Sequence, residues 1–137
     1  MSKTLCLAVL ALVSTLGSLP ARAEDKIDCD KAISTHELNA CEDKALDQAD
    51  VAMNEVYKKV LAFIAKNGTE KPYDAKSWEE ALRKSQRAWV AFRDADCKDL
   101  IPMSWTGGTG TTGAVLGCMT EKTKARTKEL SELYELE

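Results

Sequence analysis

Apolar residues recur at steps of three and four from Leu38 to Phe63, and this pattern constrains the fold more than any other feature of the chain. Such a stripe lies on one face of an α-helix, and other elements must cover it. The segment STHE, residues 34–37, has the S-x-x-E form of a helix capping box and stands directly before the stripe. Asn67-Gly68 is a helix stop signal. The pattern therefore predicts one long helix that ends near Lys66.

The rest of the chain also shows helical spacing. A second helix is predicted to begin at Asp74 or Ser77 and to end near residues 100–102, with Trp89 and Phe92 in the core. Residues 104–117, SWTGGTGTTGAVLG, hold five glycines without helical period and predict a loop. A shorter third helix is predicted from about Thr120 to Tyr134. The expected fold class is all-α, with two long antiparallel helices and a third packed across them.

The first 23 residues read as a secretory signal peptide. Lys3 precedes an apolar run, and Ala21-Arg22-Ala23 forms a small-x-small cleavage site, so we expect cleavage after Ala23. The apolar run is short for a membrane span, and Cys6 lies too early to be a lipid-modified first residue. We expect one domain at residues 24–137 that is periplasmic or secreted and has no stable membrane anchor.

The charge balance is acidic. Cleavage removes two of the 19 basic residues, Lys3 and Arg22, which leaves 17 against 22 acidic ones and changes the net charge from −3 to −5. This balance disfavours nucleic acid and anionic membrane surfaces as partners, and mildly favours cationic partners.

Four cysteines remain after cleavage: Cys29, Cys41, Cys97 and Cys118. An even number in a small exported domain predicts two disulfides, for which three connectivities are possible. The spacing favours Cys29–Cys41 and Cys97–Cys118 but does not decide between the alternatives. Each local pair would contribute about 3 kcal/mol in the chain-entropy model. Because there is no C-x-x-C motif and His36 is the only histidine, we expect no metal site and no cofactor.

Catalytic patterns are weak, and we expect that the protein is not an enzyme. Oxidised cysteines supply no thiolate, and His36 stands in a helical first turn. Acidic pairs are numerous, and nothing distinguishes one of them as a carboxylate pair for glycoside hydrolysis. The glycine-rich segment lacks the spacing of a phosphate-binding loop.

The glycine-rich segment has two other interpretations, which the sequence leaves open. It is either a connection held by a disulfide or a protruding loop that binds a partner. The candidate binding residues of the second interpretation are Met103, Trp105, Gly107, Gly108 and Thr109.

Some polar residues also recur at helical spacing, so that they lie on one face of a predicted helix. Asp50 and Asn54 share one line on the first helix, and Gln86 and Arg93 share one on the second. Facing lines would form a structural polar network, in which Asp50 pairs with Arg93 and fixes the helix register. Asp94 and Arg87 are then left as outward-facing charges.

Three segments together resemble the LprI-type lysozyme-inhibitor domain: CDKAISTHELNACEDKALDQADVAMNEVYKKVLA, SQRAWVAFRDADC and GGTGTTGAVLGCMTEKTKARTKEL. Two positions depart from the family pattern, because Met53 replaces a leucine and Thr109 replaces a serine. The residues that fall on the pattern are Cys29, Cys41, Asp50, Asn54, Tyr57, Gln86, Trp89, Arg93, Asp94, Cys97, Gly107, Gly108, Cys118 and Arg126.

The resemblance implies an exported, helical, disulfide-bonded protein. A mycobacterial lipoprotein with this domain is associated with lysozyme inhibition. The first hypothesis is thus a periplasmic protein that binds a protein partner, a cationic lysozyme, and occludes it without covalent chemistry. The alternative is an envelope interaction or immunity-type module with an unrelated protein partner.

Overall fold

The computed structural model describes residues 27–136, so the predicted signal peptide and its cleavage site lie outside the described residues. The all-α prediction is confirmed, because this part of the chain holds helices and no strand. The elements in chain order are α1 (Thr35–Asn67), α2 (Ala75–Asp94), the π-helical segment η1 (Ala95–Leu100), α3 (Ile101–Trp105) and α4 (Thr111–Leu133).

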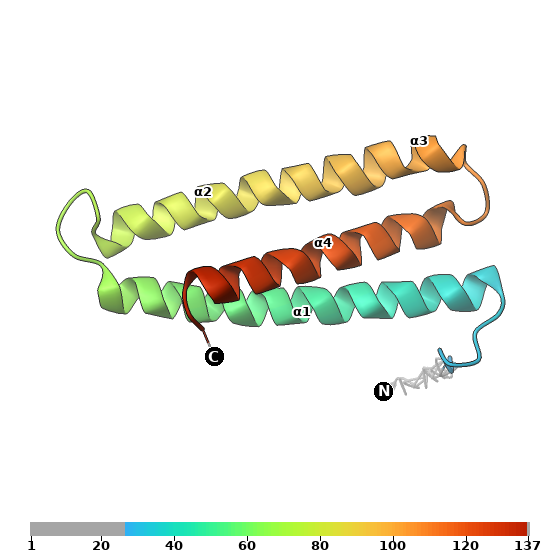
Figure 1. Cartoon of the computed structure of the whole chain (residues 1–137), viewed down its shortest axis with the longest axis horizontal. Helices are drawn as coiled ribbons and strands as arrows, with labels where there is room; N and C mark the ends of the chain where they lie inside the picture. The colour runs from blue at the N-terminus through green and yellow to red at the C-terminus, as the bar shows by residue number, and fades with distance from the viewer. Residues whose placement is uncertain (1–26, 137) are drawn as a thin grey trace, which may run out of the picture.

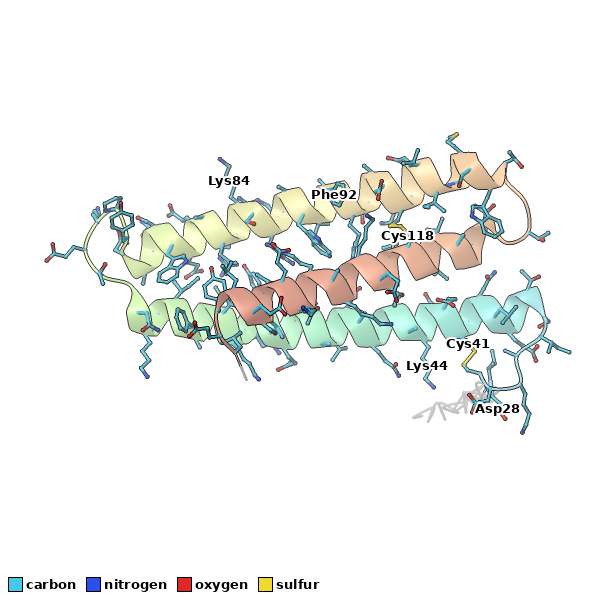
Figure 2. All side chains as sticks on the ribbon, viewed as in Figure 1. Asp28, Cys41, Lys44, Lys84, Phe92 and Cys118 are labelled. Atoms are coloured by element: carbon cyan, nitrogen blue, oxygen red, sulfur yellow. A yellow bond between two sulfur atoms is a disulfide. The ribbon has the colours of Figure 1, made fainter. Side chains whose placement is uncertain are left out.

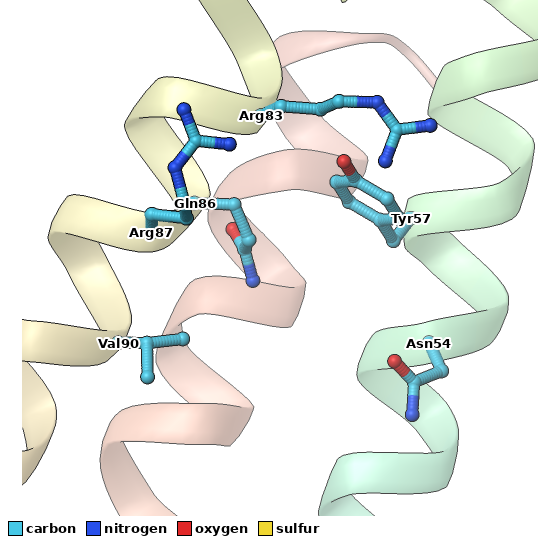
Figure 3. A pocket seen from close by; sticks show the side chains of 6 residues that line it. All are labelled: Asn54, Tyr57, Arg83, Gln86, Arg87 and Val90. Carbon is cyan, nitrogen blue, oxygen red and sulfur yellow. The ribbon is translucent and has the colours of Figure 1, made fainter.

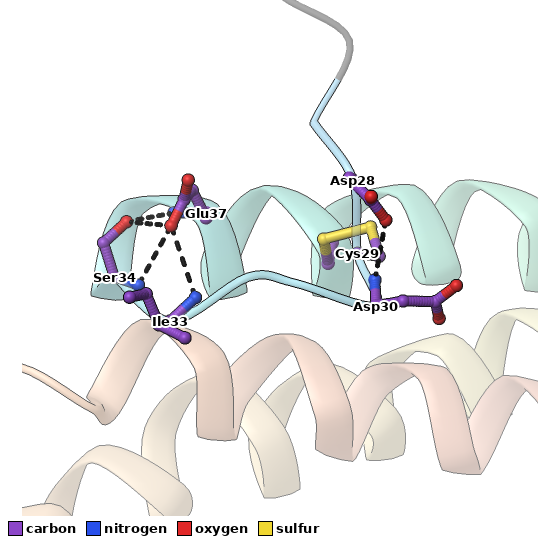
Figure 4. The surroundings of a disulfide bond; sticks show 7 residues. Asp28, Cys29, Asp30, Ile33, Ser34 and Glu37 are labelled. Atoms are coloured by element: carbon purple, nitrogen blue, oxygen red, sulfur yellow. Dashed lines mark hydrogen bonds between the residues drawn. A yellow bond between two sulfur atoms is a disulfide. The ribbon is translucent and has the colours of Figure 1, made fainter.

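The helix α1 begins at the predicted capping box (Figure 4). The Glu37 backbone N–H donates to Ser34 Oγ at 3.2 Å, and Glu37 Oε2 accepts from the Ser34 backbone N–H at 3.0 Å. These two bonds satisfy N–H groups that the first turn of a helix leaves without partners. The hydrogen bonds from Ser34 also lower the pKa of the Glu37 carboxyl.

The helix that begins at Ala75 continues beyond its predicted end near residues 100–102. Helix α2 passes through η1 directly into α3, which ends at Trp105. Pro102 lies in the first turn of α3, directly after η1, and the helical run continues past it to Trp105.

The last helix begins at Thr111, so the predicted start near Thr120 is wrong. Two of the five glycines, Gly113 and Gly117, are helical and face α1. A Cβ at Gly113 would lie 3.1 Å from Asn39 Oδ1, and one at Gly117 would lie 3.7 Å from an oxygen of Glu42. These glycines thus permit close helix packing, and the predicted loop shrinks to residues 106–110.

The three long helical runs lie side by side along one axis (Figure 1). The run from α2 to α3 is antiparallel to α1, and α4 returns parallel to α1. Helix α4 lies along α1 for most of its length and forms the closest-packed pair of the bundle. The prediction that the third helix packs across the other two is therefore wrong, because α4 packs along α1.

The core consists of two clusters of buried side chains. The larger contains Met53, Val60 and Ile64 of α1, Leu82 of α2, Leu130 of α4 and Tyr134. The smaller contains Leu46, Cys97 and Met119. Each cluster joins α1 to α4 and to the α2–η1 run, so burial of these side chains supplies the main force that holds the bundle together.

The prediction for the two aromatic residues of the second helix is partly wrong. Trp89 is half-buried and packs against the larger cluster, but Phe92 is 56% exposed. Phe92 lies at the edge of the buried face of α2, where Lys122 Nζ is 4.6 Å from its ring centroid. The packing of α2 against the other helices thus covers Trp89 and leaves Phe92 largely exposed.

Both local disulfides are present, which confirms the favoured connectivity. Cys29 pairs with Cys41 and ties the segment before α1 to that helix (Figures 2 and 4). Cys97 pairs with Cys118 and ties η1 to α4. Within residues 27–136, no helix has the length and apolarity needed to cross a membrane.

Candidate functional site

Arg93 is the centre of the first polar cluster between the helices. Its Nη1 lies 3.2 Å from Asp50 Oδ1 and donates to Thr123 Oγ1 at 3.0 Å, so it links α2 to both α1 and α4. The Arg93 side chain is only 12% exposed and stacks on Trp89, with its Cζ 5.2 Å from the ring centroid. Asp50 is 46% exposed, so the structure forms the expected pair at the edge of the core and not within it.

Asp94 belongs to this cluster as well, and its prediction as an outward-facing charge is wrong. Its Oδ1 accepts from Arg93 Nε at 3.3 Å, and its Oδ2 accepts from Lys98 Nζ at 2.9 Å. The hydrogen bond from Lys98, with a smaller contribution from Arg93, lowers the pKa of the Asp94 carboxyl. Asp94 thus binds the guanidinium at Nε, whereas Asp50 binds it at Nη1. The other residue of that prediction, Arg87, is exposed.

Arg126 is the centre of a second polar cluster that helical spacing did not predict. It is 8% exposed, and its Nε donates to Gln86 Oε1 at 3.2 Å while its Nη2 donates to Ser85 Oγ at 3.0 Å. Its Nη1 lies 2.8 Å from an oxygen of Glu129. Arg126 stands three residues after the buried Thr123 and four before the buried Leu130. This helical spacing places it on the buried face of α4 and could have identified it.

Asn54 does not join either cluster, although it was grouped with Asp50, Gln86 and Arg93. Its side chain is exposed and lines a groove between α1 and α2. Gln86 reaches the same groove but binds Arg126, and its Nε2 lies 3.6 Å from Met53 Sδ. The predicted network is thus two separate clusters, one at Arg93 and one at Arg126.

These clusters hold helices together. Each charged group is paired with fixed neighbours, as a group at the edge of a core requires. Within the part of the chain that the structure describes, no three side chains of the metal-ligating types come together. A candidate surface for partner binding lies elsewhere.

That surface is the end of the bundle where α3 turns into α4 (Figure 1). Met103 is 74% exposed and Trp105 is 48% exposed, and both lie on α3 and not in the loop to which they were assigned. The Trp105 ring packs directly against Gly110, where a Cβ would overlap the ring. Trp105 is therefore both an exposed apolar surface and the support of the loop.

The loop itself, residues 106–110, is short and fixed. Thr106 and Gly107 adopt left-handed backbone conformations, with φ of 51° and 72°. The Gly108 N–H donates to the Trp105 carbonyl at 3.0 Å, and Thr111 Oγ1 donates to the Gly108 carbonyl at 2.7 Å. Thr109 is exposed, and nothing lies within 4 Å of a Cβ placed at Gly107. The five candidate binding residues thus form one protruding corner.

Further apolar side chains lie at the same end of the molecule. Leu100 is 61% exposed on η1, and Ile33 and Leu38, near the start of α1, are 89% and 47% exposed. The contact between Gly113 and Asn39 places the start of α4 beside the start of α1. We call Ile33, Leu38, Leu100, Met103 and Trp105 the apolar end of the bundle.

Together these features define a small helical domain that is held by two disulfides and presents an apolar end. Residues 29–130 match the family model described as lysozyme inhibitor LprI, and the chain belongs to this family. It is 40% identical to the uncharacterized protein R02472 of Rhizobium meliloti (strain 1021), over 85% of this chain and 86% of that protein. It is 29% identical to the uncharacterized protein YecT of Escherichia coli (strain K12), over 90% and 89%. No solved structure matches.

Proposed function

We propose that this protein is exported and inhibits a cationic lysozyme by non-covalent binding, with the apolar end of the bundle as the contact surface. The family description supports lysozyme as the partner. The observation that carries the contact surface is that five of the ten exposed large apolar side chains of the described residues lie at this end of the molecule. Exposed large apolar side chains that lie close together on a small protein are typical of interaction sites.

The charge and the disulfides support the remaining parts of this proposal. With a net charge of −3, or −5 after cleavage at Ala23, the protein would attract a cationic enzyme and gain association rate. Two disulfides are typical of proteins that fold in an oxidising compartment. Inhibition by occlusion requires no catalytic group from this chain.

The test is the lysis of a peptidoglycan suspension by several lysozymes, with and without the purified, oxidised protein. We expect inhibition that depends on inhibitor concentration for at least one cationic lysozyme. Lysis by the protein alone would show an enzyme and contradict the proposal. No effect on any lysozyme would favour the alternative, an envelope module with an unrelated partner.

A pair of matched variants tests the surface. Met103→Glu places a charge in the apolar end, and we expect inhibition to weaken about tenfold or more, as for a central interface residue. Leu133→Glu makes the same change at the far end of α4, where Leu133 is 68% exposed, and should leave inhibition unchanged. Equal inhibition by both variants would place the contact surface elsewhere.

A further inference from the structure

The groove between α1 and α2 contains polar groups that the packing of the bundle does not use. It has a volume of about 420 Å³ and is lined by Asn54, Tyr57, Arg83, Gln86, Arg87 and Val90. Asn54 and Tyr57 come from α1 and the other lining residues from α2, with α4 behind the groove (Figure 3). The groove lies along the middle of the helices, away from the apolar end, and is independent of the proposed lysozyme contact.

Two of the lining groups have free hydrogen-bonding capacity. Among residues 27–136, the guanidinium of Arg87 and the amide of Asn54 have no hydrogen-bond partner, whereas the Tyr57 hydroxyl lies beside the Arg83 guanidinium (Figure 3). They line the same groove from its two walls, on either side of an amide, Gln86, that Arg126 holds in place (Figure 3). A few polar groups in a mainly apolar concavity are typical of ligand sites.

The charge of the groove points to an anion. Arg83 and Arg87 stand four residues apart on the same side of α2, and like charges at this spacing repel each other. Arg83 is held by Glu79, with Nη2 2.6 Å from its carboxylate, whereas Arg87 has no acidic partner among the described residues. A bound carboxylate would supply the missing partner, because a guanidinium can donate two parallel hydrogen bonds to it.

The remaining lining groups indicate what accompanies the carboxylate. The Asn54 amide offers a donor and an acceptor, which match the C=O and N–H of a peptide bond. Val90 supplies an apolar wall for a small side chain. From this arrangement we infer that the groove binds a short peptide through its free α-carboxylate, with Arg87 as the carboxylate ligand and Asn54 as the ligand of the adjacent peptide bond.

The probe for the test is acetyl-Ala-Ala with a free carboxylate, titrated into the ¹⁵N-labelled, oxidised protein and followed by backbone amide shifts. We expect saturable shifts at residues around the groove and about tenfold weaker binding of the same dipeptide with a C-terminal amide. Equal binding of the two dipeptides would overturn the inference. Inorganic phosphate that binds as tightly as the dipeptide acid would also overturn it, because the groove would then be a general anion site.

Matched variants separate the two ligand contacts from a general charge effect. Arg87→Gln should weaken binding of the dipeptide acid about tenfold or more. Lys84→Gln removes the same charge from the same helix on its outer side (Figure 2) and should leave binding unchanged. Asn54→Ala should weaken binding of acetyl-Ala-Ala but not of propionate. Unchanged binding by Arg87→Gln, or equal losses in Arg87→Gln and Lys84→Gln, would refute the assignment.

Discussion

Arg93 and Asp50 join α2 to α1 through an ion pair that is buried on one side only. The guanidinium is 12% exposed while the carboxylate is 46% exposed, with 3.2 Å between Nη1 and Oδ1. Water screens the carboxylate, so the pair contributes less than a fully buried one would. Asp94 and Thr123 also bind the guanidinium, and they remain when Asp50 is removed.

The two partners should therefore differ in their effects on stability. Asp50→Ala should lower the free energy of unfolding by about 1 kcal/mol. Arg93→Ala should lower it by about 3 kcal/mol, because it also removes the packing on Trp89 and leaves the buried Thr123 hydroxyl without its donor. Urea unfolding monitored by circular dichroism measures both values. Equal losses would contradict this account.

The two disulfides should also contribute unequally. Removal of Cys97–Cys118 by paired alanine substitutions should lower the free energy of unfolding by about 3 kcal/mol, because it frees a long loop and opens the core at the fully buried Cys97. Removal of Cys29–Cys41 releases only the exposed segment before α1, and we expect a loss of about 1 kcal/mol or less. Urea midpoints of the two double variants test the order, and the reverse order would be incompatible with these roles.

Thr106 is held in a left-handed conformation that a β-branched residue adopts only at a cost. Thr106→Gly should therefore raise the free energy of unfolding by about 0.5–1 kcal/mol. Thr109→Gly changes the same residue type in the same loop at a position without positive φ, and it should bring no gain. Thermal unfolding of the two variants gives the comparison. A gain in both would show that the loop is strained as a whole and not at Thr106.

Asp74, the N-cap residue of α2, should lower the free energy of unfolding when it is protonated in acid. Hydrogen bonds from the Ser77 hydroxyl and backbone N–H lower the pKa of the Asp74 carboxyl below its ordinary value of about 4. A carboxyl whose pKa is lowered by folding stabilises the protein above its unfolded pKa, and this contribution is lost as the pH falls through the folded pKa. Asp94, whose pKa is lowered by Lys98, acts in the same direction.

The variant Asp74→Asn keeps an accepting oxygen at the N-cap but does not titrate. Its free energy of unfolding should fall less steeply than that of the wild-type protein below about pH 4. Unfolding in urea at a series of pH values measures the two slopes. Parallel curves would show that Asp74 does not contribute to the acid sensitivity.

Local signals in the sequence predicted much of the fold. The capping box, the stop at Asn67-Gly68 and the cysteine spacing are each carried by neighbouring residues, and the structure shows the helix ends and disulfides that they indicate. The start of α4 was missed because glycine lowers helix propensity. Packing against α1 overrides this preference at Gly113 and Gly117, and that tertiary contact is not visible in a local pattern.

The candidate site could be predicted only in part, for a related reason. Met103 and Trp105 were identified as exposed apolar residues, but Ile33 and Leu38 join them only because the helices return to the same end of the bundle. Arg126 was missed by spacing because a long basic side chain normally lies on the outer face of a helix. The groove at Asn54 depends on how far α1 and α2 separate, which helical periodicity does not report.

The close pairing of α1 with α4 also sets the order in which the chain can acquire its structure. The helix that follows α1 in sequence covers little of it, and the helix that covers most of it is the last to be synthesised. Contacts between such distant segments require closure of a large loop before they stabilise the chain. Most of the apolar face of α1 therefore stays uncovered until α4 has been synthesised. Folding is completed only after that point.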